Sequence, residues 1–215
     1  MLKNFVVMGD SYSAYEGYVP EGCLPCYGPS SKQDIYRIKD TDMWWYKLKE
    51  KVGGNLLLTA AASGSAISYT GWSGYQPDYS FIGRFEKLIN EGIFEDNHID
   101  TLIFFGGTND NWIPSPLGEI KHEKITDEDK KCVLPAICYL FDKIRRNLPE
   151  TQVIVLINDL LSDAIADTLE NEAVRNGFKP LRLENIDKTD GHPNIKGMTQ
   201  ISEQLIAFLE EKQNG

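Results

Sequence analysis

The sequence predicts a three-layer α/β/α fold around a parallel sheet of roughly five strands. Two observations lead to this fold class. Short apolar runs, nearly continuous and rich in β-branched residues, recur along the chain, and such runs are typical of strands that helices cover on both faces. Segments with helical periodicity lie between the runs. Strands that alternate with helices along a chain build a parallel sheet.

Five segments have the length and composition of strands. Between and after them, five segments place apolar residues at helical spacing, as Trp44, Trp45 and Leu48 do in the first. This order predicts a sheet wound in the flavodoxin-like manner, in which ligands bind beyond the carboxyl ends of the strands. The expected strands are residues 5–8, 56–58, 99–105, 153–157 and, with a weaker pattern, 178–183. The expected helices are residues 43–52, 82–91, 128–147, 162–176 and 194–212.

Length and composition indicate one globular domain spanning residues 1–215. A chain of 215 residues can bury a full-sized core, and 41% hydrophobic with 25% charged residues excludes a disordered or collagen-like chain. Asp and Glu outnumber Lys and Arg by 32 to 22, which gives a net charge of −10. This charge repels phosphate backbones and anionic lipids, so we expect no nucleic-acid partner and no membrane insertion. The oligomeric state stays open.

The amino terminus and the cysteines bear on the compartment. The first apolar stretch is too short for a signal peptide, so the default is cytoplasmic, and secretion or a periplasmic location stays open if a leader was removed. The four cysteines do not form the framework of a small secreted domain. Cys23 and Cys26 have CxxC spacing, but no second close pair of ligands accompanies them and they lie in a Pro/Gly-rich loop. We expect loop thiols or a single disulfide there.

Residues suited to acyl-transfer chemistry follow three of the expected strands. Ser11 follows the first strand beside Gly9, which permits a tight turn that exposes a nucleophile. Gly64 lies in the turn after the second strand and Asn109 in the Gly-rich turn after the third. Backbone N–H groups and a side-chain amide are the donors that an oxyanion requires. The alternatives are a helix cap for Ser11 and ordinary turn chemistry for the other two.

A histidine near the carboxyl end supplies the base that such a serine needs. His192 lies in a loop just before the last expected helix and is followed by a proline. A serine hydroxyl becomes a good nucleophile when a base takes its proton, and a carboxylate usually orients the imidazole. Two acids, Asp187 and Asp190, precede His192 by five and two residues. We expect Asp10 and Asp110 to organise turns, and His98 and His122 to be solvated or to cap neighbouring elements.

Together these motifs resemble the SGNH (GDSL-type) serine hydrolases, a lipase/acylhydrolase family. The resemblance runs from Gly9 to Gly197 through the motifs Gly-Asp-Ser, Gly-Gly-Thr-Asn-Asp and Gly-His-Pro-Asn. It implies a flavodoxin-like sheet with the site at the strand carboxyl ends. It also implies that Ser11 attacks an ester carbonyl and that His192 acts as general base and then as acid. The oxyanion is then held by the backbone N–H groups of Ser11 and Gly64 and by the Asn109 side chain, without a metal or cofactor.

The sequence departs from this family at the acid. The family usually places its acid three residues before the histidine, where this chain has Thr189. Asp190 reaches the ring if the segment is extended, because alternate side chains then share a face. Asp187 reaches it if the segment loops back, and a backbone carbonyl is the third candidate. The identity of the group that orients His192 stays open.

Aromatic residues are frequent in the expected loops. Their faces suit the C–H faces of sugar rings, which suggests a carbohydrate ester, and anchoring of the loops is the equal alternative. The leading hypothesis is a serine esterase that removes a short acyl group, such as acetyl, from a carbohydrate or small alcohol. The alternatives are a thioesterase or lysophospholipase of the same fold, and a glycan-binding domain without activity. The aromatic residues are Tyr12, Tyr15, Tyr18, Tyr27, Tyr69, Trp72, Tyr75, Tyr79 and Trp112.

Overall fold

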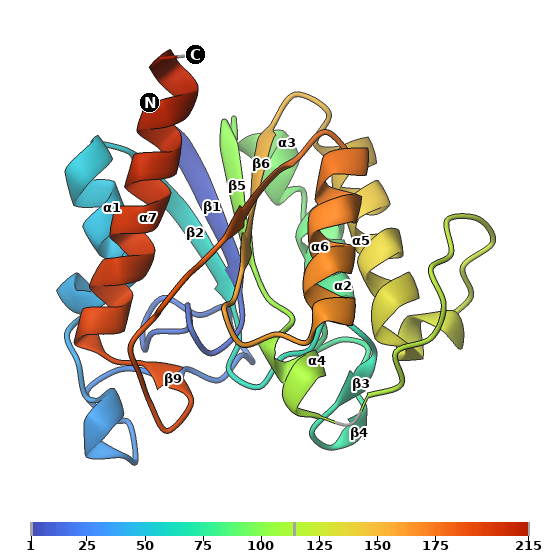
Figure 1. Ribbon diagram of the computed structural model, residues 1–215, viewed down its shortest axis with the longest axis horizontal. Coiled ribbons are helices and arrows are strands. Elements are labelled where there is room, and N and C mark those ends of the chain that lie inside the picture. The colour runs from blue at the N-terminus through green and yellow to red at the C-terminus, as the bar shows by residue number, and fades with distance from the viewer. Residues whose placement is uncertain (1, 114, 215) are drawn as a thin grey trace.

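A sheet of five parallel strands forms the centre of the computed structural model, which describes residues 2–113 and 115–214. The strand order is β2-β1-β5-β6-β7, so the chain starts near the middle of the sheet and extends it in both directions (Figure 1). This arrangement confirms the predicted flavodoxin-like α/β fold. The strands are β1 (Asn4–Gly9), β2 (Asn55–Ala61), β5 (Thr101–Phe105), β6 (Gln152–Ile157) and β7 (Lys179–Arg182).

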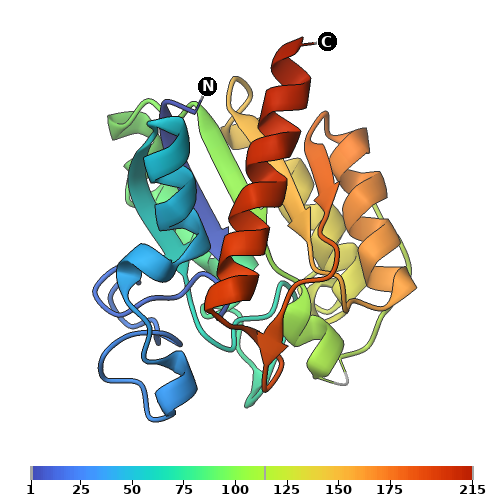
Figure 2. The same ribbon diagram turned by 60° about the vertical axis from the view of Figure 1, so that its left-hand side comes forward.

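Helices cover both faces of the sheet, and Figures 1 and 2 show the resulting three layers. Helices α1 (Trp44–Val52) and α7 (Ile195–Asn214) pack side by side on one face. The other face carries α2 (Phe81–Asn90), α5 (Val133–Asn147) and α6 (Asp163–Arg175). Within the described residues, no helix combines the length and the apolar character needed to cross a membrane. Short elements join the layers: α3 (Ile93–Asp96), α4 (Thr108–Trp112) and the two-stranded ribbons β3 (Thr70–Gly71) with β4 (Gly74–Tyr75) and β8 (Lys188–Thr189) with β9 (His192–Pro193).

The strands are continuous apolar runs because both faces of the sheet are buried, as the sequence predicts. In β1, Val6 and Met8 belong to the core on the α2/α5/α6 face, and Phe5 and Val7 belong to the core on the α1/α7 face. All four are at most 1% exposed, so successive side chains are buried on opposite faces. Each contributes about 1.5–3 kcal/mol from burial. A parallel sheet between two helical layers therefore requires apolar residues at every position.

One predicted helix begins later than expected. Residues 128–147 were expected to form a single helix, but α5 starts at Val133, and Asp129–Lys131 form a separate 3₁₀ turn. Pro135 explains the difference: it has no N–H to donate to the carbonyl of Lys131, so a helix that starts upstream would be interrupted there. In the first turn of α5 the missing donor costs nothing, because N–H groups there have no partner within the helix.

The register of the sheet brings three loops together at one edge. Gly9 at the end of β1 is paired with Ala61 of β2 on one side and with Phe105 of β5 on the other. The segments that begin at Asp10, at Ala62 and at Gly106 therefore leave the sheet side by side. These loops carry the residues that the sequence singled out.

Candidate active site

Ser11 lies in a tight turn directly after β1 and is 1% exposed. Within the turn, Oδ1 of Asp10 accepts the N–H of Tyr12 at 3.0 Å, so Asp10 organises the turn as expected. A Cβ at Gly9 would overlap the side chain of Ser13, which explains the glycine. Trp45 of α1 donates its indole N–H to the carbonyl of Ser13 at 3.1 Å. The turn is therefore held from both sides, and Ser11 has a defined position.

His192 reaches Ser11 from the other end of the chain. Its Nε2 lies 3.1 Å from Oγ of Ser11, and its Nδ1 lies 3.2 Å from the backbone carbonyl oxygen of Asp190. Because a carbonyl only accepts hydrogen bonds, Nδ1 carries the proton in the tautomer that bonds the Asp190 carbonyl. Nε2 is then unprotonated and can accept the hydroxyl proton of Ser11. The pair has the geometry of a nucleophile with its base.

Neither predicted carboxylate orients His192. The carboxylate of Asp187 pairs with Nζ of Lys196 at 2.5 Å. In the described residues, the Asp190 carboxylate makes no hydrogen bond to the His192 ring either. The extended segment that would bring Asp190 alongside the ring does not form. Instead, Thr189 pairs with His192 across the β8/β9 ribbon, and Asp190 and Gly191 form its two-residue turn with φ of 47° and 77°. Two positive φ values are typical of a type I′ Asp-Gly hairpin, and this turn presents the Asp190 carbonyl to Nδ1.

Three tyrosines hold this hairpin in place. The hydroxyl of Tyr36 lies 3.1 Å from Nδ1 of His192, on the side of the ring away from Ser11. Tyr12 donates its hydroxyl to the carbonyl of Gly191 at 2.5 Å, and Tyr27 donates to the carbonyl of Pro193 at 2.8 Å. No pattern in the sequence indicated Tyr36, because it lies in a polar loop and its partner is more than 150 residues away. The hairpin is positioned by the amino-terminal loops.

The surroundings of His192 favour its neutral form. The rings of Tyr12, Tyr36 and Trp112 pack against the imidazole edge-on, with centroids 5.5, 5.1 and 5.4 Å away. Burial lowers the pKa of His192 below its ordinary value, and the hydrogen bond to the Asp190 carbonyl and the Asp190 charge oppose this shift. A histidine that is neutral near pH 7 can act as a general base.

Donors suited to an oxyanion lie beside Ser11. Within the described part of the chain, the backbone N–H groups of Ser11 and Gly64 have no acceptor. Gly64 has φ of +78°, a conformation that a side chain would strain. Asn109 donates one N–H to the carbonyl of Ser65 at 2.9 Å, and its Oδ1 accepts the indole N–H of Trp72 at 2.9 Å. These two bonds orient the amide and leave its second N–H for a substrate.

Asp110 and Arg84 shape the loops that carry these donors. Asp110 accepts the N–H groups of Ile67 and Ser68 at 2.7 and 3.0 Å, so it organises a turn as expected. Arg84 of α2 donates to the carbonyls of Gly9 and Ala60, at the ends of β1 and β2. Its guanidinium also donates to Oγ of Ser65 at 3.0 Å. Arg84 was not predicted, although a charged residue on the apolar face of a helix was a visible signal.

Two charged residues near Ser11, Asp10 and Arg84, are buried. Burial raises the pKa of Asp10 to about 7, and the nearby positive charge of Arg84 opposes that shift. Burial lowers the pKa of Arg84 to about 10. Oδ2 of Asp10 has no hydrogen-bond partner among the described residues. Asp10 therefore binds a proton much more readily in the folded protein than in an unfolded chain.

A groove of about 560 Å³ opens beside His192, and its lining includes Glu16, Lys32 and Tyr36. Cys26 also lines the groove. Cys23 and Cys26 are free thiols, which agrees with the expectation of loop thiols rather than a redox pair. Burial raises the pKa of Cys26 to about 12, so this thiol is inert at neutral pH.

The loop aromatics range from buried to exposed. Some are structural, such as Tyr12 and Tyr27, which hold the β8/β9 hairpin. Others are open to solvent: Trp72 is 60% exposed although its indole N–H bonds Asn109. The indole of Trp72 is therefore open to solvent beside Asn109. The buried aromatics are Tyr12, Tyr15, Tyr27 and Tyr69, the exposed ones are Tyr18, Trp72 and Tyr75, and Tyr79 and Trp112 are partly buried.

Comparison with known proteins agrees with this geometry. The family model described as GDSL-like lipase/acylhydrolase matches residues 3–209. Among solved structures, the chain is similar to a protein named as a GDSL-like lipase from Bacteroides ovatus, with 34% identity, a TM-score of 0.90, and 98% of this chain and 99% of that chain covered. A second such protein, from Bacteroides uniformis, has 30% identity and a TM-score of 0.89, with 98% and 96% covered.

A more distant structure shares the fold. It is an acetyl xylan esterase from the rumen bacterium Butyrivibrio proteoclasticus, with 17% identity, a TM-score of 0.64, and 99% of this chain and 64% of that chain covered. No curated protein sequence matches the chain. The match along residues 3–209 and the two Bacteroides structures establish the family. The chain belongs to the GDSL-like lipase/acylhydrolase family and is an ester hydrolase.

Proposed function

We propose that this enzyme is a serine esterase that removes a short acyl group, such as acetyl, from a carbohydrate or small alcohol through an acyl-enzyme on Ser11. The observation that carries the proposal is the contact of 3.1 Å between Oγ of Ser11 and Nε2 of His192, with Nδ1 of the same ring bonded to a carbonyl. This arrangement prepares a nucleophile and its base before substrate binds. We also propose that residues 1–215 act as a single catalytic domain.

The first half-reaction forms the acyl-enzyme. Oγ of Ser11 attacks the ester carbonyl carbon while Nε2 of His192 takes the hydroxyl proton. The resulting oxyanion accepts hydrogen bonds from the N–H groups of Ser11 and Gly64 and from the amide of Asn109. The C–O bond to the alcohol then breaks, and His192 returns its proton to the leaving oxygen.

The second half-reaction releases the acid. His192 takes a proton from a water molecule, which attacks the acyl carbon, and the same donors hold the second oxyanion. The bond to Oγ breaks, and the proton passes from His192 back to Ser11. The backbone carbonyl of Asp190 fixes the tautomer of His192 throughout, the role that a carboxylate plays in a Ser-His-Asp triad. The negative charge of the Asp190 carboxylate stabilises the imidazolium from a greater distance.

Two features support a small, polar substrate. The groove beside His192 is lined in part by Glu16 and Lys32, and a long acyl chain would remove these two charged groups from water at a cost in free energy. The exposed indole of Trp72 lies next to Asn109 and can stack on a sugar ring. That a protein sharing this fold is an acetyl xylan esterase is consistent with the proposal.

Hydrolysis of a short aryl acetate by the purified protein tests the nucleophile and the reaction class together. We expect turnover by the native protein and almost none by Ser11→Ala. A serine-reactive phosphonate added to the native protein should form one covalent adduct, which peptide mass mapping assigns to Ser11. The control is Ser31→Ala, at a serine whose hydroxyl bonds the carbonyl of Cys26. If both the acetate and the phosphonate fail to react, the esterase proposal is wrong, and a glycan-binding domain becomes the better interpretation.

The substrate class needs a separate comparison. We expect a higher kcat/KM for an acetylated xylo-oligosaccharide than for an acyl thioester or a lysophospholipid. A higher kcat/KM for the thioester or the lysophospholipid would leave Ser11 as the nucleophile and would reassign the enzyme to the thioesterase or lysophospholipase alternative.

A further inference from the structure

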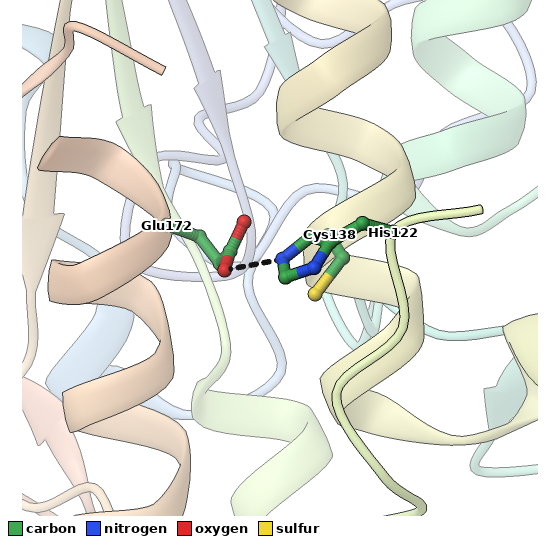
Figure 3. Close-up of side chains that lie close together, drawn as sticks. All are labelled: His122, Cys138 and Glu172. Carbon is green, nitrogen blue, oxygen red and sulfur yellow. Dashed lines mark hydrogen bonds and ion pairs between the residues drawn. The ribbon is translucent and has the colours of Figure 1, made fainter. Parts of the chain in front are cut away.

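Three side chains with metal-binding atoms meet on the face of the sheet that carries α5 and α6. Cys138 comes from α5, Glu172 from α6, and His122 from the irregular segment before α5 (Figure 3). Their ligand atoms all lie within 4.8 Å of one another. Nε2 of His122 lies 2.8 Å from Oε1 of Glu172. From the sequence, His122 is expected to be solvated or to cap an element, but its ring lies against a buried acid.

The carboxylate of Glu172 is only partly compensated for its burial, because one of its two oxygens makes no hydrogen bond. Its side chain is 5% exposed, and Oε2 has no hydrogen-bond partner among the described residues. The nearest positive charge is the guanidinium of Arg175, 3.5 Å from Oε2, on a side chain that is itself 53% exposed. Cys138 beside it is 2% exposed, with its thiol among these charges. A buried carboxylate oxygen whose one charged neighbour is a half-exposed guanidinium is costly, and a metal ion bound there would offset more of that cost.

We propose that His122, Cys138 and Glu172 bind a zinc ion, with water as the fourth ligand. An imidazole nitrogen, a thiolate and a carboxylate together suit Zn²⁺, whereas Mg²⁺ and Ca²⁺ take oxygen ligands. On binding, the S–H bond of Cys138 is replaced by a Zn–S bond and its proton goes to solvent. His122 is the most exposed of the three, so the water lies on its side of the ion.

The spacing requires a small adjustment. Bonds of about 2.0–2.3 Å at tetrahedral angles put ligand atoms about 3.3–3.7 Å apart. The Glu172 and His122 atoms are already close, so the main movement is that of His122 and Glu172 toward Sγ. His122 can make this movement because its segment, residues 115–128, is irregular backbone without helix or strand.

The proposed site is separate from the ester chemistry. Ser11 and His192 lie at the carboxyl ends of the strands, where Tyr12 and Tyr36 belong to the core on the α1/α7 face. The zinc ligands lie among the helices of the opposite layer, and Figure 1 shows the loop before α5 on the far side of the sheet from β9. The ion would join this loop to α5 and α6, so its role would be structural.

Titration of the metal-free full-length protein with Co²⁺, followed by displacement with Zn²⁺, tests the site. We expect one equivalent of Co²⁺ to produce the near-ultraviolet charge-transfer band of a cobalt–thiolate bond, and Zn²⁺ to abolish it. Cys138→Ser removes the band, and Cys132→Ser, which changes a thiol outside the cluster, leaves it. Zn²⁺ should raise the Tm of the native protein and of Cys132→Ser, but not the Tm of Cys138→Ser.

His122→Gln provides a variant that is safe for folding, because His122 lies partly exposed on a loop. It should weaken Co²⁺ binding by more than about tenfold, the loss that removal of even an outer partner of a metal ligand produces. His98→Gln, at an exposed histidine outside the cluster, should bind as the native protein does. Absence of stoichiometric binding, or a band that survives Cys138→Ser, overturns the proposal and leaves a His122–Glu172 ion pair.

Discussion

The hydroxyl of Tyr36 lies 3.1 Å from Nδ1 of His192, the ring nitrogen that faces away from Ser11. Nδ1 also contacts the Asp190 carbonyl at 3.2 Å. In the described residues, no carboxylate hydrogen-bonds to this nitrogen. A phenol and a carbonyl thus occupy the place where a Ser-His-Asp triad has its acid. Neither group carries a formal charge, so in the proposed mechanism dipoles stabilise the imidazolium at close range and the Asp190 charge acts from a greater distance.

Replacing Tyr36 and Asp187 one at a time should distinguish the contribution of the phenol to catalysis from that of a carboxylate. Tyr36→Phe removes one hydrogen bond worth about 1 kcal/mol and should lower kcat about fivefold with little change in KM. Asp187→Asn should change kcat by less than about twofold, because its carboxylate pairs with Lys196 instead. Steady-state kinetics on an aryl acetate provide both values. A loss of about 10⁴-fold in Asp187→Asn, as in a true triad, would contradict this arrangement.

The acid side of the pH profile should report His192. Because burial lowers its pKa, His192 stays neutral and active to a more acidic pH than an ordinary histidine, so the midpoint of kcat/KM falls below about 6.5. The negative charge of Asp190 raises that pKa. Asp190→Asn should therefore move the midpoint to still lower pH. A midpoint that moves upward in Asp190→Asn would show that the carboxylate does not act on His192 by its charge.

Asn109 and Trp72 should affect catalysis to different degrees. Asn109→Ala removes an oxyanion donor and should lower kcat by about 10²–10³-fold at unchanged KM. Trp72→Phe keeps an aromatic ring but loses the indole N–H that orients Asn109, so a smaller loss in kcat is expected. Trp72→Ala also removes the stacking surface. Its additional loss should appear only with an acetylated sugar, and an equal loss with an aryl acetate would argue against stacking.

Arg84 should matter for stability. Arg84→Met removes the guanidinium donors from the carbonyls of Gly9 and Ala60 and leaves Gly9 only the N–H of Ala62, which should lower the free energy of unfolding by about 3 kcal/mol. The matched control is Arg146→Met, on the surface of α5, whose ion pair with Asp142 is exposed and should contribute less than about 1 kcal/mol. Urea denaturation of both variants measures the difference. Equal midpoints would show that water replaces the guanidinium.

Asp10 should make stability depend on pH. Its pKa is about 7 in the folded protein and 3.8 in a model peptide, so between these values the folded state holds a proton that the unfolded state has lost. Stability from this group therefore falls as pH rises through that window. Asp10→Asn keeps the bond to the Tyr12 N–H and removes this dependence. Its Tm relative to native protein should be higher at about pH 8 than at about pH 5, with Asp142→Asn as the control for loss of one charge.

The local pattern of the sequence was sufficient for the fold. Continuous apolar runs such as Val153–Ile157 mark strands buried on both faces, and alternation with helices fixes a parallel sheet. Pro135 and the Asp190-Gly191 pair were also readable signals, for a later helix start and for a hairpin turn. Both are short-range effects of one residue's backbone chemistry.

Ser11, Gly64 and Asn109 could be placed from the sequence because each follows a strand, and the carboxyl ends of parallel strands share an edge. The sequence was sufficient to propose His192 as the base, but not to identify the group that contacts its Nδ1. Which group reaches Nδ1 depends on the turn of β8/β9 and on Tyr36, whose contact spans more than 150 residues. The same holds for Arg84 and for the His122–Glu172 contact. Secondary structure follows from interactions between neighbours in the chain, whereas these contacts exist only once distant segments have packed, so only the tertiary structure decides them.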